Sequence, residues 1–258
     1  MYKFIEYSVR NRVAYITLNK VNTGNALDKL LIQELADAMD TALKDYSTKV
    51  IVIKANGPTF CTGIDTAYHK KMQEQPYTEN LHASNQIKEL LKSIYHHPKV
   101  VIAQVQGDAV ALGFALAYSC DFVFASTNVR MGHPEVSLGL IPAIALPILL
   151  RKTNEATARM LLLSGKLISA TEALDYGLIS HTCTAEQLDI KVEQFASALC
   201  LDNSTQSMAV TKKLIAQLQG MPLEDALTYA AESSAQNRLN EDSRKGIASL
   251  ILQEKPRW

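Results

Sequence analysis

One acidic residue, Glu135, lies in the apolar stretch MGHPEVSLGLIPA at positions 131–143. Charged residues are sparse in this part of the chain. Between positions 100 and 150 they are Asp108, Asp121, Arg130 and Glu135. A carboxylate among apolar residues can have either of two roles. Glu135 could stabilise the first turn of a helix through the helix dipole, or it could act as a catalytic acid/base in a partly desolvated site.

Two other segments could stabilise negative charge with backbone groups. Residues 50–65 run from an apolar strand to Gly63-Ile64-Asp65, and residues 100–113 run from a second apolar strand to Leu112-Gly113. Ligands in parallel sheets bind beyond the carboxyl ends of strands, and a turn that opens a helix leaves N–H groups free. Facing turns of this kind would form a two-donor oxyanion hole, each donor contributing roughly 2.7–4 kcal/mol to a transition state. Ordinary strand-to-helix turns are the alternative.

The elements around these turns predict an α/β fold. Residues 13–20 alternate as a strand, and Asp28 is placed to cap a helix that begins near Lys29. Residues 50–55, 100–107 and 121–126 are apolar runs typical of strands buried on both faces. Strands alternating with helices favour parallel pairing. Residues 66–98 are polar and interrupted by Pro76, which predicts a mobile surface segment able to cover a ligand.

Composition excludes several classes of protein. The 258 residues are 47% hydrophobic, which suits one large α/β domain with a helical piece after about Thr153. Lysine plus arginine equals aspartate plus glutamate at 26 each, so bulk charge favours neither nucleic acid nor an anionic membrane. The longest apolar run is too short to cross a bilayer, and the first residues lack a signal-peptide pattern. Four dispersed cysteines without a CxxC pair predict a cytoplasmic protein with free thiols and no metal site.

Five motifs in order carry a resemblance to a known family. They are LNKVNTGNALD, GPTFCTGID, VQGDAVALGFALAYSCDFVFAS, MGHPEVSLGLIPA and SGKLISATEALDYGLI, followed by the ending EDSRKGIASLILQEKPRW. Their order and spacing closely resemble the crotonase (enoyl-CoA hydratase/isomerase) superfamily over nearly the whole chain. The resemblance implies a crotonase-type spiral of ββα units over residues 1–197 and a C-terminal α-helical trimerisation region over residues 198–258. It also implies a homotrimer, often paired into a hexamer.

The resemblance further implies that the substrate is an acyl-CoA thioester, with coenzyme A as part of the substrate and no separate cofactor. An acyl-carrier-protein thioester presents the same pantetheine and stays open. By position, the N–H groups of Ile64 and Leu112 would hold the thioester carbonyl, and Glu135 would be the catalytic acid/base. The predicted substrate-binding residues are Phe60, Thr62, Gly63, Asp65, Thr66, Gly113, Ala115, His133 and Pro142. Asp65 could instead hold its own turn, and His133 could be a packed, neutral histidine.

The sequence departs from the family pattern at the predicted hole. Many hydratases of the family carry two glutamates, and the position of the first is Ala115 here. The family's glycine run is thinned to Ala111-Leu112-Gly113, and Leu112 is expected to bring bulk where the thioester passes. Asp108 is the only spare acid near the hole in sequence.

A single carboxylate leaves three functions open. The LGLIPA region looks most like a branch related to methylglutaconyl-CoA hydratase and the dehydratases of polyketide β-branching, whose members commonly lack the first glutamate. This favours a lyase that adds or removes water. The alternatives are an enoyl-CoA isomerase with one glutamate as its base, and a non-catalytic acyl-CoA-binding protein. An RNA-binding role gains little support from a net charge of zero.

Overall fold

The strands form two sheets in a computed structural model that describes residues 2–258. The larger sheet has the order β1-β2-β3-β5-β7-β10. Its strands are β1 (Ile5–Arg10), β2 (Val13–Leu18), β3 (Val50–Ala55), β5 (Val100–Val105), β7 (Phe122–Ser126) and β10 (His181–Cys183). Only the β1–β2 pair is antiparallel among these described strands. The parallel α/β prediction is therefore confirmed.

A second sheet of short strands holds the functional turns. Its order is β4-β6-β8-β9, with β4 (Thr59–Cys61), β6 (Asp108–Val110), β8 (Arg130–Gly132) and β9 (Ile168–Ser169). β4, β6 and β8 are mutually parallel neighbours, and β9 pairs antiparallel with β8. The carboxyl ends of three adjacent parallel strands therefore meet at one edge of this sheet.

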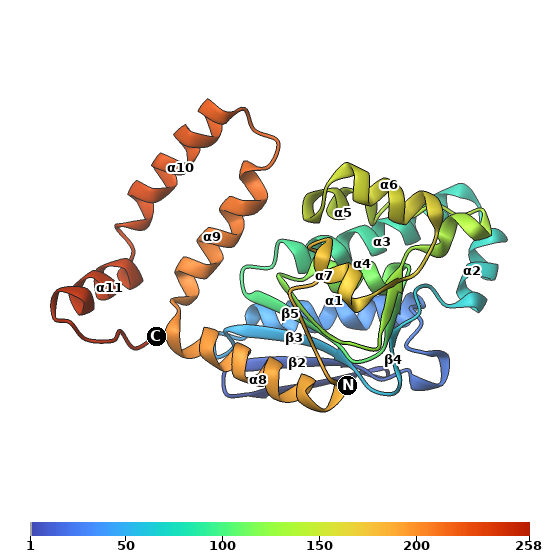
Figure 1. Cartoon of the computed structure of the whole chain (residues 1–258), viewed down its shortest axis with the longest axis horizontal. Coiled ribbons are helices and arrows are strands. Elements are labelled where there is room, and N and C mark those ends of the chain that lie inside the picture. Colours follow the sequence, from blue (N-terminus) through green and yellow to red (C-terminus); the bar gives the residue numbers. More distant parts are fainter. Residues whose placement is uncertain (1) are drawn as a thin grey trace.

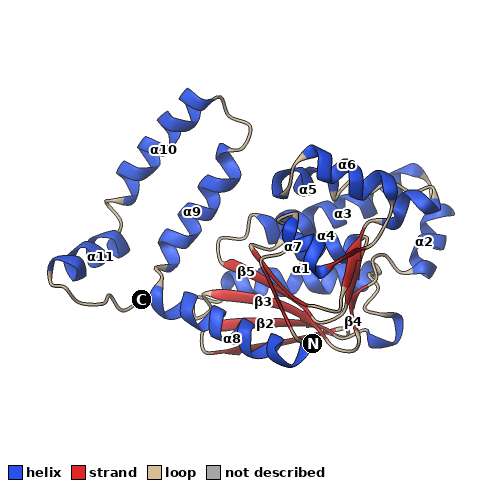
Figure 2. Ribbon diagram, in the orientation of Figure 1, coloured by secondary structure: helices blue, strands red, loops and turns tan. Residues whose placement is uncertain are grey.

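The chain repeats a ββα unit between the two sheets. In each unit the first strand joins the larger sheet, the second joins the smaller one, and helical structure follows (Figure 2). The units are β3-β4 with α2 (Thr66–Gln73) and α3 (Tyr77–Tyr95), β5-β6 with α4 (Leu112–Ser119), and β7-β8 with η2 (Pro134–Leu138) and α5 (Leu146–Lys152). The structure thus confirms the predicted ββα spiral.

Helices cover both faces of the larger sheet (Figure 1). One face packs against a core that includes α1 (Lys29–Lys44), α3 and α4, and the other packs against α8 (Ala185–Asp202). Asp28 caps α1 as predicted, with its carboxylate accepting from the Leu31 N–H at 2.9 Å. α6 (Glu155–Ser164) and α7 (Ala170–Asp175) complete the central part of the chain, and η1 (Val21–Thr23) lies in the loop before α1.

The segment 66–98 differs from its prediction. α3 buries one side of its length, namely Ala83, Ile87, Leu90, Leu91 and Ile94. These residues recur every three or four positions and face α1 and the sheet core. The polar residues between them masked this stripe, so α3 packs on the core along one side, whereas α2 buries none of its described residues and lies at the surface as predicted.

The last three helices form an arm that stands away from the sheets (Figure 1). None of the described residues of α9 (Thr205–Leu218), α10 (Leu223–Asn237) and α11 (Glu241–Ile251) is buried. The boundary predicted between residues 197 and 198 falls within α8, whose last buried residue is Cys200. No helix in residues 2–258 is long and apolar enough to cross a membrane.

Candidate active site

Three strand ends bring the predicted catalytic groups to one edge of the smaller sheet. Ile64 follows β4, Leu112 follows β6 and Glu135 follows β8, and these three strands are adjacent and parallel. The sequence predicted that the long strands β3 and β5 carry these turns. Both belong to the larger sheet, and each ends before the short strand, β4 or β6, that leads into the turn. The short strands between were absent from the sequence prediction.

The N–H of Ile64 is left free by the way its turn is held. Leu27 donates to the Gly63 carbonyl at 2.7 Å and accepts from the Asp65 N–H at 3.0 Å. Ile64 lies between these two bonds in a parallel bridge with Leu27, so its own N–H and C=O point to the opposite side. Within residues 2–258 no acceptor occupies that N–H.

Leu112 supplies a second free donor because it is the first residue of α4. Ala111 precedes it with φ 53° and ψ −124°, a strained conformation for a residue other than glycine. The Ala111 N–H donates to the Gly132 carbonyl at 2.8 Å, which ties the turn to β8. A Cβ placed on Gly63 would lie 3.5 Å from the Leu112 nitrogen. The two turns are therefore immediate neighbours, as an oxyanion hole requires.

The residues around the two turns are packed closely. Leu112 is buried and belongs to the main core cluster, and the crowding of the thioester expected from its bulk stays a prediction. Gly113 has a different constraint, because a Cβ there would lie 2.2 Å from the Cys61 carbonyl oxygen. Burial raises the pKa of the neighbouring Cys61 thiol to about 12, which makes it an inert filler.

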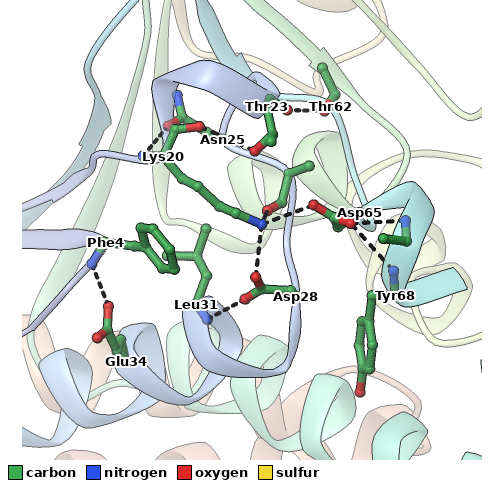
Figure 3. Close-up of polar contacts among 12 residues, drawn as sticks. Phe4, Lys20, Thr23, Asn25, Asp28, Leu31, Glu34, Thr62, Asp65 and Tyr68 are labelled. Carbon is green, nitrogen blue, oxygen red and sulfur yellow. Dashed lines mark hydrogen bonds and ion pairs between the residues drawn. The ribbon is translucent and has the colours of Figure 1, made fainter. Parts of the chain in front are cut away.

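A half-buried lysine, Lys20, fixes the turn that carries Ile64 (Figure 3). The Lys20 Nζ donates to Asp28 at 2.8 Å and to Asp65 at 2.9 Å, and these aspartates are the N-caps of α1 and α2. Asp65 also accepts from the N–H groups of Ala67 and Tyr68. The hydrogen bond from Lys20 holds the pKa of Asp65 below its ordinary value. Asp65 thus holds its own turn, the structural alternative considered from the sequence.

Glu135 lies at the start of a hydrogen-bonded chain inside the protein. Its Oε1 is 3.1 Å from His133 Nδ1, and His133 Nε2 is 3.1 Å from the Tyr118 hydroxyl. His133 is fully buried, whereas the Glu135 side chain is 15% exposed. Glu135 Oε2 is buried and has no hydrogen-bond partner in the described part of the chain. Burial raises the pKa of Tyr118 well above its ordinary value, so the hydroxyl keeps its proton at neutral pH.

The other predicted residues fall into two groups. Phe60, Ala115 and His133 have no exposed surface, because Phe60 and Ala115 belong to the main core cluster and His133 lies behind Glu135. These three side chains therefore do not reach the surface in this structure, and their predicted contact with substrate stays a prediction. Gly63 is also buried, Pro142 is half-buried, and Thr62 and Thr66 are exposed.

Asp108, the spare acid near the hole in sequence, is paired with Arg130. Its carboxylate accepts from the Arg130 backbone N–H at 2.8 Å and from the Arg130 guanidinium at 3.0 Å. Sequence reasoning missed two residues, Lys20 and Tyr118. A tyrosine hydroxyl in the largely apolar α4 was the available signal, because buried tyrosine hydroxyls normally have a partner.

Comparison with known proteins identifies the family of this arrangement. The family model for enoyl-CoA hydratase/isomerase matches residues 8–258. The chain belongs to the enoyl-CoA hydratase/isomerase family. It is 32% identical over 257 residues to the (E)-benzylidenesuccinyl-CoA hydratase of Thauera aromatica, with 95% of each chain covered. It is 29% identical over 250 residues to the 2,3-dehydroadipyl-CoA hydratase of Escherichia coli, with 96% of each chain covered.

Solved structures agree with this membership. An enoyl-CoA hydratase from Shewanella pealeana superposes with a TM-score of 0.94 at 27% identity, covering 99% of this chain and 96% of that one. As a hydratase/isomerase family enzyme, the chain places two free backbone donors and one carboxylate at a common edge. Paired N–H donors suit a developing oxyanion, and an acid/base group beside them suits proton transfer at a neighbouring carbon.

Proposed function

We propose that this enzyme adds water to, or removes it from, an unsaturated or 3-hydroxyacyl-CoA thioester. The observation that carries the proposal is the convergence of Ile64, Leu112 and Glu135 at the carboxyl ends of three adjacent parallel strands. The thioester oxygen would accept from the Ile64 and Leu112 N–H groups. Those donors would stabilise the enolate that forms when hydroxyl adds at C3.

One carboxylate is sufficient for the proton balance of hydration. Glu135 Oε2 takes a proton from water as the water oxygen bonds to C3 and the C2=C3 electron pair moves into the thioester enolate. The same Oε2 then returns that proton to C2, which regenerates the carboxylate. Dehydration is the reverse sequence. Asp108 is not required for either direction, since Arg130 holds its carboxylate.

Isomerisation is the second candidate, and Ala115 is the observation that favours it. No carboxylate stands at this position to help activate water, whereas moving a double bond needs only one base that removes and returns a proton. Incubation with a 2-enoyl-CoA and a 3-enoyl-CoA in separate reactions distinguishes the two activities. Water addition to the 2-enoyl-CoA supports the lyase, and turnover of the 3-enoyl-CoA alone would replace it with an isomerase.

The full assay covers 2-enoyl, 3-enoyl, methylglutaconyl and 3-hydroxyacyl thioesters, each on coenzyme A and on acyl carrier protein. Preference for one carrier decides which thioester is the natural one. Tight thioester binding without turnover of any member of the panel would refute catalysis and leave an acyl-CoA-binding protein.

We further propose that the enzyme is a trimer or hexamer held through the C-terminal arm. Apolar side chains on α9–α11 are exposed, including Ile215 at 60%, Leu223 at 72% and Leu250 at 77%. A cavity of about 880 Å³ separates the arm from the edge of the sheet core. Exposed apolar surface on this scale marks an association site. Light scattering at micromolar concentration tests the proposal, and a monomer would contradict it.

A further inference from the structure

Two aromatic residues of α4 pack against His133, the histidine that contacts Glu135. Tyr118 lies near the end of α4, and its ring packs edge-on against Phe114 with centroids 5.1 Å apart. The His133 ring lies against both, 5.6 Å from Phe114 and 5.7 Å from Tyr118. All eight residues of α4 are buried. The same rigid helix therefore carries the Leu112 donor at its start and contacts the histidine behind Glu135 near its end.

The hydrogen positions in the chain follow from donor counting. A carboxylate only accepts, so the His133 Nδ1 that faces Glu135 must carry a hydrogen. A neutral imidazole has one N–H, which leaves Nε2 as an acceptor for the Tyr118 hydroxyl. The Tyr118 oxygen is also 3.3 Å from the Ala145 carbonyl, compared with 3.1 Å from His133 Nε2. If Tyr118 donated to the Ala145 carbonyl instead, its oxygen would accept a hydrogen bond from His133 Nε2. A neutral His133 would then carry its only hydrogen on Nε2 and present the Nδ1 lone pair to the Glu135 carboxylate.

In this arrangement the two carboxylate oxygens of Glu135 have different roles. Oε1 accepts from Nδ1–H whether Glu135 is ionised or has taken a proton on Oε2. Oε2 has no protein partner among residues 2–258 and is free for the reacting proton. No proton needs to leave Tyr118 or His133 during the reaction, so a single tautomer of His133 suits both states of Glu135.

We propose that Tyr118 and His133 are positioning residues: Tyr118 fixes the His133 tautomer, and His133 holds Oε1 so that Oε2 alone transfers the proton. The inference rests on the proposed function of Glu135. It adds that α4 sets the geometry between the oxyanion hole and the base, because both ends of the helix contribute.

Three variants and a matched control test the proposal through kcat, KM and melting temperature. Tyr118→Phe should lower kcat about 3- to 10-fold with KM unchanged, the loss expected for one neutral hydrogen bond. His133→Leu should lower kcat about 10- to 100-fold, because a charged acceptor loses its donor. His133→Gln should stay within about threefold of wild type, since its amide can donate to Oε1. Ser119→Ala removes another buried hydrogen bond of α4, to the Ala115 carbonyl, and should leave kcat unchanged.

Nitrogen NMR of the histidine rings gives a readout that does not depend on activity. Wild type should show His133 protonated on Nδ1, and Tyr118→Phe should reduce that tautomer. An Nε2-protonated His133 in wild type would overturn the proposal, as would wild-type kcat in Tyr118→Phe or equal losses in the Gln and Leu variants. If wild type turns over no thioester, the proposed function fails, and the NMR result still decides the hydrogen positions.

Discussion

Replacement of Glu135 by glutamine isolates the proton-transfer step from binding and folding. The amide keeps the side-chain volume, and its oxygen can accept from His133 Nδ1 where Oε1 does now, at 3.1 Å. What disappears is the basic atom. General acid/base groups contribute typically ~10²–10⁴-fold, and Ala115 offers no second carboxylate. We therefore expect kcat of Glu135→Gln to fall by about 10³–10⁴-fold.

Thioester affinity and stability should change little in the same variant. The thioester oxygen would be held by backbone N–H groups of Ile64 and Leu112, which the substitution does not touch. Removing a partly buried charge offsets the cost of placing an amide NH₂ where Oε2 has no partner, so we expect the free energy of unfolding to stay within about 1 kcal/mol. A role as a helix-end acid predicts the opposite pattern, with activity within twofold and a stability loss of about 0.3–1 kcal/mol.

The assay follows the ultraviolet absorbance of the conjugated enoyl thioester, with binding by calorimetry and stability by thermal melting. Glu172→Gln is a matched control, because Glu172 is a capping-box acid that accepts from the Ser169 N–H at 2.8 Å. It should lower stability slightly and leave kcat unchanged. Wild-type turnover in Glu135→Gln would refute the assignment of the base, whatever its effect on melting.

Three further predictions concern the supports of the site. Gly113→Ala places a methyl group 2.2 Å from the Cys61 carbonyl oxygen; calorimetry should show weakened thioester binding, and melting a loss of about 1–3 kcal/mol. Lys20→Met leaves two N-cap aspartates without their cation and should cost about 1–3 kcal/mol, whereas Lys44→Met, in an exposed pair, should change stability by less than about 0.5 kcal/mol; equal effects would contradict this. Burial lowers the pKa of His97 to about 4. Because the unfolded chain then binds a proton that the folded protein does not, unfolding free energy should fall between pH 6.5 and 4, by about 3 kcal/mol, and His97→Gln should flatten that slope in melts across the range.

The long elements could be predicted because their patterns are strong. β3 and β5 each have five apolar residues out of six, and α1 has both a cap and a stripe of buried residues. The strands that deliver the site could not be predicted in the same way. β4, β6 and β8 have three residues each, too few for a period to be recognised. Their pairing depends on contacts between residues that are about 20–50 positions apart.

The site itself was predictable at its backbone groups and less so at its side chains. Ile64 and Leu112 follow turns whose positions are readable from glycine and from strand ends. The contact between Tyr118 and His133 joins residues 15 positions apart, with β7 and β8 between them, and no local pattern encodes it. The pairing of Asp108 with Arg130 likewise joins residues that are distant in the sequence, so the sequence did not indicate that Asp108 has a partner.

The packing of α4 bears on the absence of a carboxylate at position 115. Ala115 is fully buried, one residue after Phe114 and three before Tyr118. The rings of Phe114, Tyr118 and His133 pack against one another, and His133 contacts Glu135. A second carboxylate at position 115 would enter this apolar cluster without the exposure that an ionised group needs. Glu135 is therefore the single carboxylate that the proposed hydration relies on, and its proton transfer is the step that Glu135→Gln tests.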